Sequence, residues 1–356
     1  MPWTMTQNVA QYQGANWDNY VKTVSNCSPA QAKLIAFQDP SITYFFYCRD
    51  PMVLTNGHSF QSGDAVFFNG TQKPWWGSAP QCDGYARLCL AVGYAGANAA
   101  SLQTALEMTY EGGPALDAVI FTVNLNDVAT IPTGYAQIVP SAAGPTVLTA
   151  NAEVQTLLAG PIASVVSQAH NQGTAVLMCG LNNHDAAGWA EFQTLADAQQ
   201  FAGQCATVLG QYGFDGVDID DEYSTGTVND TSLAMASYCV DGAVAPKTLS
   251  KALYDDTQYA PNQYENMTIF WNLTWGWTMS YGTSAQIQMQ PYASLMGNNR
   301  QCCGFWADAG VPNSDQITWL YANGYAGVMV YSVTDTGGAS LLNTLLGYWS
   351  AAQSGG

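Results

Sequence analysis

The segment Tyr212–Tyr223, with the sequence YGFDGVDIDDEY, carries five acidic residues within eight positions. These residues are Asp215, Asp218, Asp220, Asp221 and Glu222. In an extended strand, successive side chains point to opposite faces. Asp218, Asp220 and Glu222 therefore share one face, and Asp221 lies on the other face with Val217 and Ile219. We expect the apolar face to pack against helices and the three carboxyls to face the axis of a barrel.

Three ionised carboxylates this close together would repel one another, and such repulsion raises the pKa of at least one of them. We therefore expect one of Asp218, Asp220 and Glu222 to hold a proton near neutral pH. A carboxyl that keeps its proton can act as a general acid. The segment thus indicates an acid–base site at the end of a strand.

From about residue 87 onward, apolar runs rich in Val, Ile and aromatic residues alternate with stretches of helical period. This pattern is typical of βα units around a parallel sheet. The predicted strands are Arg87–Gly93, Asp117–Asn124, Thr174–Leu181, Asp215–Asp220, Asn266–Asn272, Gln286–Gln290, Gly304–Ala307 and Gly327–Val333. Eight such units match the usual size of a (β/α)8 TIM barrel, whose catalytic side chains lie at the carboxyl ends of the strands. We therefore predict an α/β fold with this barrel over residues 86–356.

Helical periodicity is strongest over Thr194–Leu209, where Thr194 can cap the first turn and Gly213 follows the last. A second helical stretch covers Glu153–Gln172, and Gly160-Pro161 should kink or restart it. Two more predicted helices, Asp315–Ala322 and Ser340–Ala351, flank the last strand.

Residues 1–85 have a different pattern, with few long helical periods. Strand-like runs cover Ser41–Cys48 and Ala65–Asn69, and a Trp75-Trp76 pair follows. We predict a small, partly β N-terminal appendage over residues 1–85. The tryptophan pair is either a carbohydrate platform or part of a small hydrophobic core.

The composition excludes several classes of partner. The chain has 356 residues, and 26 Asp and Glu against 8 Lys and Arg give it a formal net charge of −18. This charge leaves no positive surface for phosphates, so we expect no nucleic acid and no membrane partner and favour a neutral, polar substrate. The longest apolar runs, such as Ala175–Cys179, are far shorter than the roughly 20 residues that cross a bilayer.

Nine cysteines and five Asn-x-Ser/Thr sequons, at Asn26, Asn69, Asn229, Asn266 and Asn272, favour a secreted, extracellular protein. The first 20 residues contain no export signal, so we expect any such signal to be removed or to lie outside this sequence. No Cys-x-x-Cys or His/Cys cluster occurs, and the three histidines are scattered. We predict no metal and no cofactor.

The spacing Asp215-x-x-Asp218-x-Asp220-x-Glu222 matches the signature of glycoside hydrolase family 18, which the chain resembles over about residues 87–345. Other segments resemble the endo-β-N-acetylglucosaminidases of the endoglycosidase H type more than the chitinases. These segments are Ala118–Phe121 with Asn124 and Asn126, and Val176–Leu181 followed by Asn182, Asn183, His184 and Gly188. Residues 1–85 fall outside the resemblance.

The resemblance implies a role for each acid of the signature. Glu222 would donate a proton to the glycosidic oxygen and later act as the base for water. Asp220 would orient the 2-acetamido group of the substrate as that group attacks the anomeric carbon, which is substrate-assisted retention. Asp218 would share a proton or a hydrogen bond with Asp220, and Asp215 would support the strand and its turn.

The resemblance also implies substrate-binding residues. Tyr292 resembles the sixth-strand tyrosine that holds the acetamido oxygen, with Gln290 beside it. Tyr331 occupies the last-strand aromatic position that floors the sugar at subsite −1. From the residues themselves, Trp275 and Trp277 are candidate sugar platforms beyond a strand end. Asn182, Asn183 and His184 either contact the glycan or cap the next helix, and Asn124 completes the candidate binding set.

The resemblance implies a hydrolase that cuts the β-1,4 bond of the GlcNAc-GlcNAc core of N-linked glycans, and we expect it to act as a monomer. Two alternatives remain open, a chitinase with the same residues and a non-catalytic glycan-binding lectin on the same barrel. A calcium loop is disfavoured, because the acidic run lacks the glycine that the sharp turn of an EF-hand needs.

Overall fold

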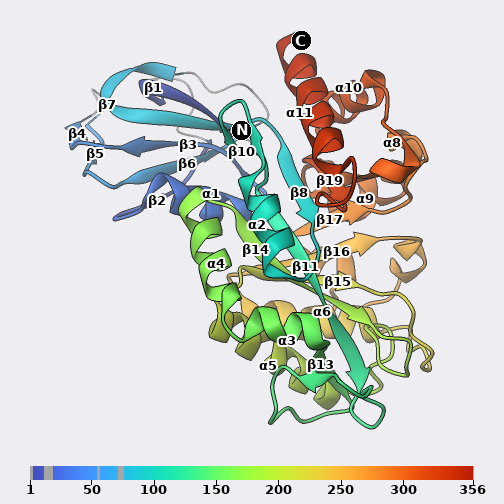
Figure 1. The fold of residues 1–356 in the computed structure, drawn as a ribbon. Coiled ribbons are helices and arrows are strands. Elements are labelled where there is room, and N and C mark those ends of the chain that lie inside the picture. The colour runs from blue at the N-terminus through green and yellow to red at the C-terminus, as the bar shows by residue number, and fades with distance from the viewer. Residues whose placement is uncertain (1–2, 12–18, 54–56, 71–75, 356) are drawn as a thin grey trace.

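The computed structural model describes residues 3–11, 19–53, 57–70 and 76–355. An N-terminal sheet lies beside an eight-stranded parallel barrel (Figure 1). The N-terminal sheet has the order β1-β7-β3-β6-β2 and is antiparallel throughout. Its strands are β1 (Trp3–Gln11), β2 (Tyr20–Val24), β3 (Ile42–Cys48), β6 (Ala65–Asn69) and β7 (Trp76–Arg87). The helix α1 (Pro29–Phe37) packs on it, and β4 (Met52–Val53) and β5 (Ser59–Phe60) form a small hairpin.

The barrel closes because β8 pairs in parallel with both β11 and β19. Its strands, in order, are β8 (Leu90–Tyr94), β11 (Ala118–Asp127), β14 (Ala175–Asn182), β15 (Gly216–Asp220), β16 (Thr248–Leu253), β17 (Trp275–Thr278), β18 (Gln301–Trp306) and β19 (Gly327–Tyr331). The predicted (β/α)8 barrel is confirmed. Two short antiparallel strands, β12 (Ala136–Gln137) and β13 (Thr146–Ala150), extend β11 beyond the barrel.

Helices connect the barrel strands and cover the barrel's outer surface (Figure 1). They are α2 (Ala99–Glu107), α3 (Ala152–Leu158), α4 (Pro161–Gln172), α5 (Leu195–Tyr212), α6 (Ser232–Val244), α7 (Ile269–Asn272), α8 (Ala285–Met289), α9 (Ala293–Met296), α10 (Ser314–Ala322) and α11 (Gly338–Gly355). The predicted cap is present, because the Thr194 side chain accepts a hydrogen bond from the Asp197 amide. Gly213, with φ 77°, ends α5, and Gly160-Pro161 separates α3 from α4 as predicted.

The fifth and sixth predicted strands were wrong. Asn266–Asn272 contains the short helix α7, and Gln286–Gln290 lies largely in α8. The alternating run QIQMQ has the period of a strand, but the Ser284 side chain caps a helix there by accepting from the Ile287 amide. The true strands are β16, whose buried Lys251 hides its apolar character, and β17, which is only four residues long.

Apolar side chains fill the interior of the barrel in layers, as this fold requires. They include Leu90, Val92, Ala118, Ile120, Ala175, Leu177, Cys179, Ala252, Trp275, Trp277, Cys302 and Met329. The two tryptophans have no exposed surface. The polar residue Asp218, on β15, is buried in the same interior.

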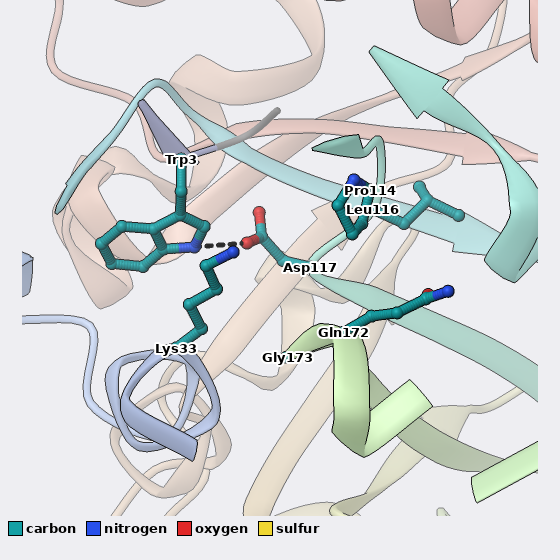
Figure 2. A pocket seen from close by; sticks show the side chains of 7 residues that line it. All are labelled: Trp3, Lys33, Pro114, Leu116, Asp117, Gln172 and Gly173. Carbon is teal, nitrogen blue, oxygen red and sulfur yellow. Dashed lines mark hydrogen bonds between the residues drawn. The ribbon is translucent and has the colours of Figure 1, made fainter. Parts of the chain in front are cut away.

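The N-terminal residues close the amino end of the barrel. Phe37, at the end of α1, joins the interior cluster, and its carbonyl accepts a 2.7 Å hydrogen bond from Trp275 Nε1. The Arg87 guanidinium lies 4.9 Å from the ring of Trp3. Figure 2 shows a small hollow at this end, where Trp3 Nε1 donates to Asp117 Oδ1 at 2.9 Å beside Lys33.

The proposed division at residues 85 and 86 stays a prediction. Strand β7 runs through that boundary to Arg87, and contacts such as that of Phe37 with Trp275 bind the two parts together. The side chains of the Trp75-Trp76 pair lie outside the part of the chain that the structure describes. Among the described helices, none has the length and apolar character needed to cross a membrane.

Phe37 closes the amino end of the barrel, so its truncation should destabilise the protein. Truncating Phe37 to Ala should lower the free energy of unfolding by about 3–5 kcal/mol, because it leaves a cavity beneath the barrel interior. Urea unfolding followed by tryptophan fluorescence measures this change. The control is Val311→Ala at a side chain that is 61% exposed, where the change should stay within about 0.5 kcal/mol. Equal effects of both substitutions would contradict this role of Phe37.

Candidate active site

The acidic segment spans the end of β15 and the start of the loop that follows it. Asp218 has no exposed surface and faces the barrel interior. Asp220 is the last residue of the strand and is partly buried, and Glu222 follows two residues later in the β15–α6 loop. A side chain on Gly216, where the strand begins, would meet the Thr248 carbonyl at 2.3 Å. The glycine in the acidic segment therefore permits β15 and β16 to approach closely.

Asp218 is held by hydrogen bonds from two other strands. The Tyr94 hydroxyl, from β8, donates to Oδ2 at 2.5 Å, and the Ser250 hydroxyl, from β16, donates to Oδ1 at 2.7 Å. Trp277 Nε1 in turn donates to the Tyr94 hydroxyl at 3.0 Å. Burial raises the pKa of Asp218 to about 6, and these hydrogen bonds limit the rise because they favour the charged form.

Asp220 has an unfilled acceptor. Its Oδ1 atom is buried and has no hydrogen-bond partner among the described residues. Burial raises the pKa of Asp220 to about 7, and the negative charge of Glu222 adds to the rise. A proton on one of these carboxyls at neutral pH agrees with the repulsion argument. An unfilled acceptor at the end of an inner strand is suited to receive an N–H group from a bound molecule.

Tyr223, the residue after Glu222, packs against His184 at the carboxyl end of the barrel. The Tyr223 hydroxyl hydrogen-bonds to the Glu222 carboxylate, and this contact raises the pKa of Tyr223. The ring of His184 lies 4.9 Å from the ring of Tyr223. Both residues have positive φ, 61° for His184 and 62° for Tyr223, a strained conformation for side chains of this size that is found often at functional sites.

Aromatic residues from four strand ends form a wall next to the carboxyls. Tyr331, at the end of β19, is 43% exposed. Its ring stacks on Tyr281 at 5.8 Å and contacts Trp306 at 6.1 Å and Tyr94 at 5.9 Å. Burial raises the pKa of Tyr281, and the nearby negative charges of Asp220 and Glu222 raise it further. Tyr281 therefore lies within the electrostatic reach of the acids.

The sequence prediction missed Tyr281 and named Tyr292 instead. Tyr292 is buried outside the barrel in a short 3₁₀ turn, where its hydroxyl accepts from the Asp256 amide at 3.3 Å. Gln290 is exposed on the same turn. The error follows from the misplaced sixth strand, because Tyr281 comes three residues after the true strand β17. An aromatic residue just beyond a Trp-Gly-Trp strand was the available signal.

Trp275 and Trp277 are a second correction. Both lie inside β17, fully buried in the barrel interior, and both indole N–H groups have protein partners. They cannot present a face to a sugar. The predicted fifth strand ended at Asn272, so the tryptophans appeared to lie beyond it. They belong instead to β17, which is only four residues long.

The remaining predicted residues take different places. Asn182 is buried at the end of β14, where its amide donates to Asp185 Oδ1 at 3.1 Å and its oxygen accepts from the His184 amide, so it shapes the β14–α5 loop. Asn124 is partly buried on the same face of β11 as the interior residue Ile120. Asp215 supports the strand, because its Oδ2 pairs with His170 Nε2 at 2.9 Å and accepts from the Val176 amide.

The carboxyl that faces outward, Asp221, belongs to a separate buried cluster. Its Oδ1 accepts from the Ala190 amide at 3.3 Å. Lys251 Nζ lies 3.0 Å from Asp256 Oδ1 in the same region. Burial alone would lower the pKa of Lys251, but the charges of Asp256 and Asp221 raise it. Across the described residues, no three His, Cys, Asp or Glu side chains are placed to hold a metal ion.

The sequence is similar to a protein of known name. No family model matches the sequence. An endo-beta-N-acetylglucosaminidase from Flavobacterium sp. (strain SK1022) is 29% identical over 174 residues, which are 46% of this chain and 54% of that protein. The chain thus spans about half the length of the curated relative that it matches.

Two solved structures share the fold. EndoBT-3987 of Bacteroides thetaiotaomicron, solved with a Man5GlcNAc product, has a TM-score of 0.56 at 15% identity, covering 93% of this chain and 84% of that chain. A chitinase of the same species has a TM-score of 0.50 at 13% identity, covering 75% and 97%. The 93% share exceeds the part that follows residue 87, so this likeness extends into the N-terminal residues. The chain is therefore a homologue of an endo-beta-N-acetylglucosaminidase, with the (β/α)8 barrel that EndoBT-3987 and the Bacteroides chitinase also have.

Proposed function

We propose that the protein is a retaining, substrate-assisted glycoside hydrolase that cuts the β-1,4 bond between the two core N-acetylglucosamines of N-linked glycans. The observation that carries this proposal is the order of three carboxyls along β15, with Asp218 buried, Asp220 holding an unfilled acceptor and Glu222 beyond the strand end. The Flavobacterium relative is an endo-beta-N-acetylglucosaminidase, and this supports the proposed substrate. EndoBT-3987, whose structures hold Man9GlcNAc2Asn substrate and Man5GlcNAc product, supplies the same fold.

In the first step, protonated Glu222 gives its proton to the glycosidic oxygen. The acetamido carbonyl oxygen of the sugar at subsite −1 attacks the anomeric carbon, and the bond to the leaving N-acetylglucosamine breaks. An oxazolinium ion results. In the second step, the Glu222 carboxylate takes a proton from water, the water oxygen attacks the same carbon, and the oxazolinium ring opens to the free acetamido sugar.

Asp220 fits the task of holding the attacking group. Its unfilled Oδ1 can accept the acetamido N–H, and its negative charge stabilises the positive charge that develops on the oxazolinium ring. The charged form is the working form, and it becomes the major one as the pH rises through the pKa of about 7. Asp218, with a pKa of about 6, shares the remaining proton of the pair.

The aromatic wall fits the sugar at subsite −1. Tyr331 exposes its ring, and a pyranose stacks its apolar C–H face on such rings. Tyr281 takes the role that the resemblance assigned to a tyrosine after the sixth strand, in which the hydroxyl holds the acetamido oxygen. A neutral substrate also suits a chain of net charge −18, because that charge repels anionic polymers.

We also propose that the protein acts outside the cell, where N-linked glycoproteins occur. The cysteine content and the sequons support this proposal. Asn26 and Asn266 are exposed, whereas Asn272 is buried and its amide donates to Ser237 Oγ, so Asn272 is not an accessible glycosylation site in the folded protein.

The variant Glu222→Gln tests the proposed reaction. The wild type should shorten a high-mannose glycopeptide to a peptide that carries one N-acetylglucosamine, as mass spectrometry would record. The Gln variant should keep binding the glycopeptide but lose about 10²–10⁴-fold in kcat, because it cannot donate the proton. Exposed Glu107→Gln, on α2, is the matched control and should leave kcat unchanged.

Chitin oligomers and binding assays serve as further arms of that experiment. Cleavage of chitin oligomers with an intact glycopeptide would replace the proposed function with that of a chitinase. Glycopeptide binding without cleavage by wild type and variant alike would replace it with that of a lectin. Full activity of Glu222→Gln would remove Glu222 from the acid role.

The variant Asp220→Asn tests the proposed role of Asp220. The neutral amide cannot stabilise the oxazolinium ring, so kcat should fall by about 100-fold. KM should change little, because the charge acts mainly on the transition state. Steady-state kinetics at pH 8, where wild-type Asp220 is charged, measure both values. Unchanged kinetics would show that Asp220 does not act on the acetamido group.

A further inference from the structure

Two loops beside Glu222 are joined by a row of hydrogen bonds. One is the β14–α5 loop, residues 183–194, and the other is the β15–α6 loop, residues 221–231. The Thr225 amide donates to the Asp185 carbonyl at 2.8 Å, and the Asn229 amide donates to the Ala190 carbonyl at 2.8 Å. Gln193 Nε2 donates to the Thr227 carbonyl at 2.8 Å. The loop that carries Glu222 is therefore braced along its length by the β14–α5 loop.

Glu191 lies at the centre of this contact. A side chain on Gly226 would meet Glu191 Cγ at 2.7 Å, and one on Gly188 would meet Glu191 Oε2 at 2.0 Å. The glutamate is thus clasped between backbone of both loops, and its Oε2 atom is buried with no hydrogen-bond partner among the described residues. A buried carboxylate oxygen without a partner is costly, whereas a protonated carboxyl in the same place is not charged.

Glu191 lies near Asp221 and Ser224, one residue before and two residues after Glu222. Ser224 hydrogen-bonds to the Glu191 carboxyl, and the Ser224 hydroxyl oxygen also accepts from the Gly226 amide at 3.1 Å. On the other side, the amide of Ala190, the residue before Glu191, donates to Asp221 Oδ1 at 3.3 Å, so Asp221 lies beside this part of the β14–α5 loop. Glu222 therefore lies between two residues that are close to Glu191.

We propose that Glu191 is a positioning residue for the acid Glu222, which it fixes through Asp221 and Ser224 while the Glu191–Asp221 pair keeps one proton. The proposal rests on the proposed function, because it assigns Glu222 the acid role. Ionisation of both members would place two negative charges close together and push the loops apart.

Burial and the neighbouring charges set the pH at which Glu191 loses its proton. Burial raises the pKa of Glu191 to about 7, and the charge of Asp221 adds to the rise. Asp256, Lys251 and the Tyr259 hydroxyl complete the cluster, with Lys251 as its one cation among the described residues. The pKa of Glu191 lies above its ordinary value of 4.5. The support that protonated Glu191 gives to the β15–α6 loop is therefore complete below pH 4.5 and is lost as the pH rises through about 7.

The test compares wild type, Glu191→Gln and Glu191→Ala between pH 5 and pH 9, with Glu107→Gln as the control. Gln keeps the shape of the protonated acid without titrating, so it should retain kcat at pH 6 and move the alkaline fall of kcat upward by about one pH unit. Ala should lower kcat by about 10-fold at pH 6 with little change in KM, because the brace is lost. Identical pH profiles for wild type and Glu191→Gln would overturn the proposal.

Hydrogen exchange separates this failure from failure of the proposed function. At pH 9, amides of residues 221–231 should exchange faster in wild type than in Glu191→Gln, and at pH 5 the two proteins should match. This readout needs no substrate. Equal exchange at both pH values would overturn the positioning role even if the enzyme proved active, whereas the expected difference in an inactive protein would refute only the proposed function.

A separate observation concerns Cys48 and Cys82 on the neighbouring strands β3 and β7. They are direct partners in the antiparallel register, both have no exposed surface, and their Sγ atoms lie 3.0 Å apart. Cys48 directs its amide to the Asp64 carbonyl and its carbonyl to the Gly63 amide, on the side of β6. The two cysteines therefore form a non-hydrogen-bonded pair, in which Cα atoms lie about 4.5 Å apart, within the range that a disulfide spans.

The geometry points to a disulfide between Cys48 and Cys82, formed during folding before burial. Two thiols and one molecule of oxidised glutathione, or another disulfide of that class, would yield the Cys48–Cys82 bond and two reduced thiols by exchange. The electron pair passes to the oxidant disulfide, and the two thiol protons end on its sulfurs. This proposal does not depend on the reaction at Glu222.

Mass spectrometry tests the bond in protein refolded with oxidised and reduced glutathione, then denatured and alkylated without reductant. Seven of the nine cysteines should be alkylated, and one peptide pair should join residues 48 and 82 with the loss of two hydrogens. In the Cys48→Ser/Cys82→Ser variant all seven remaining cysteines should react, and dithiothreitol should lower Tm in wild type alone. Nine alkylated cysteines, or a link between other cysteines, would overturn the proposal.

Discussion

The burial of Asp218 inside an apolar barrel is the constraint on which the site depends. A charged group without water is unfavourable unless hydrogen bonds replace the lost hydration. Tyr94 on β8 and Ser250 on the neighbouring strand β16 supply two such bonds, and Trp277 fixes the hydroxyl of Tyr94. The remaining desolvation appears as raised pKa values for Asp218 and Asp220. Because the interior resists negative charge, the strand end keeps a proton available at neutral pH.

The two ends of the barrel have different tasks. At the amino end, Phe37 and the Trp3–Asp117 contact close the interior and bind the N-terminal sheet to the barrel. At the carboxyl end, residues with strained backbone and exposed rings, such as Tyr223 and Tyr331, surround the acids. This separation is general for the fold, in which one face serves stability and the other serves chemistry. Substitutions at the two ends should therefore affect different properties.

Much of this arrangement was predictable from local patterns. The period of two along residues 217–222 correctly placed Asp218 and Asp220 inward, and the cap at Thr194 with the glycine at 213 correctly bounded α5. These features depend on neighbours in sequence. The strands β16 and β17 were missed because their burial depends on residues that are distant in sequence. The buried Lys251 pairs with Asp256, and the buried Trp277 donates a hydrogen bond to Tyr94.

The errors at the site have the same origin. Tyr281 could not be found while the sixth strand was misplaced, and Trp275 and Trp277 appeared to lie beyond a predicted strand that is in fact the helix α7, whereas they belong to β17. Glu191 carried no signal in the sequence, because its importance comes from two glycines and an aspartate on facing loops. Long-range contacts of this kind are visible only in three dimensions.

The central claim is that the inward carboxyls on β15 guide the substrate's own acetamido group to the anomeric carbon. Proton NMR of the first product formed from a high-mannose glycopeptide tests this most directly, because it records the anomer before mutarotation. The new reducing end should appear first as the β-anomer, since two inversions restore the configuration. An initial α-anomer would mean that water attacks the bond directly, and it would contradict the account.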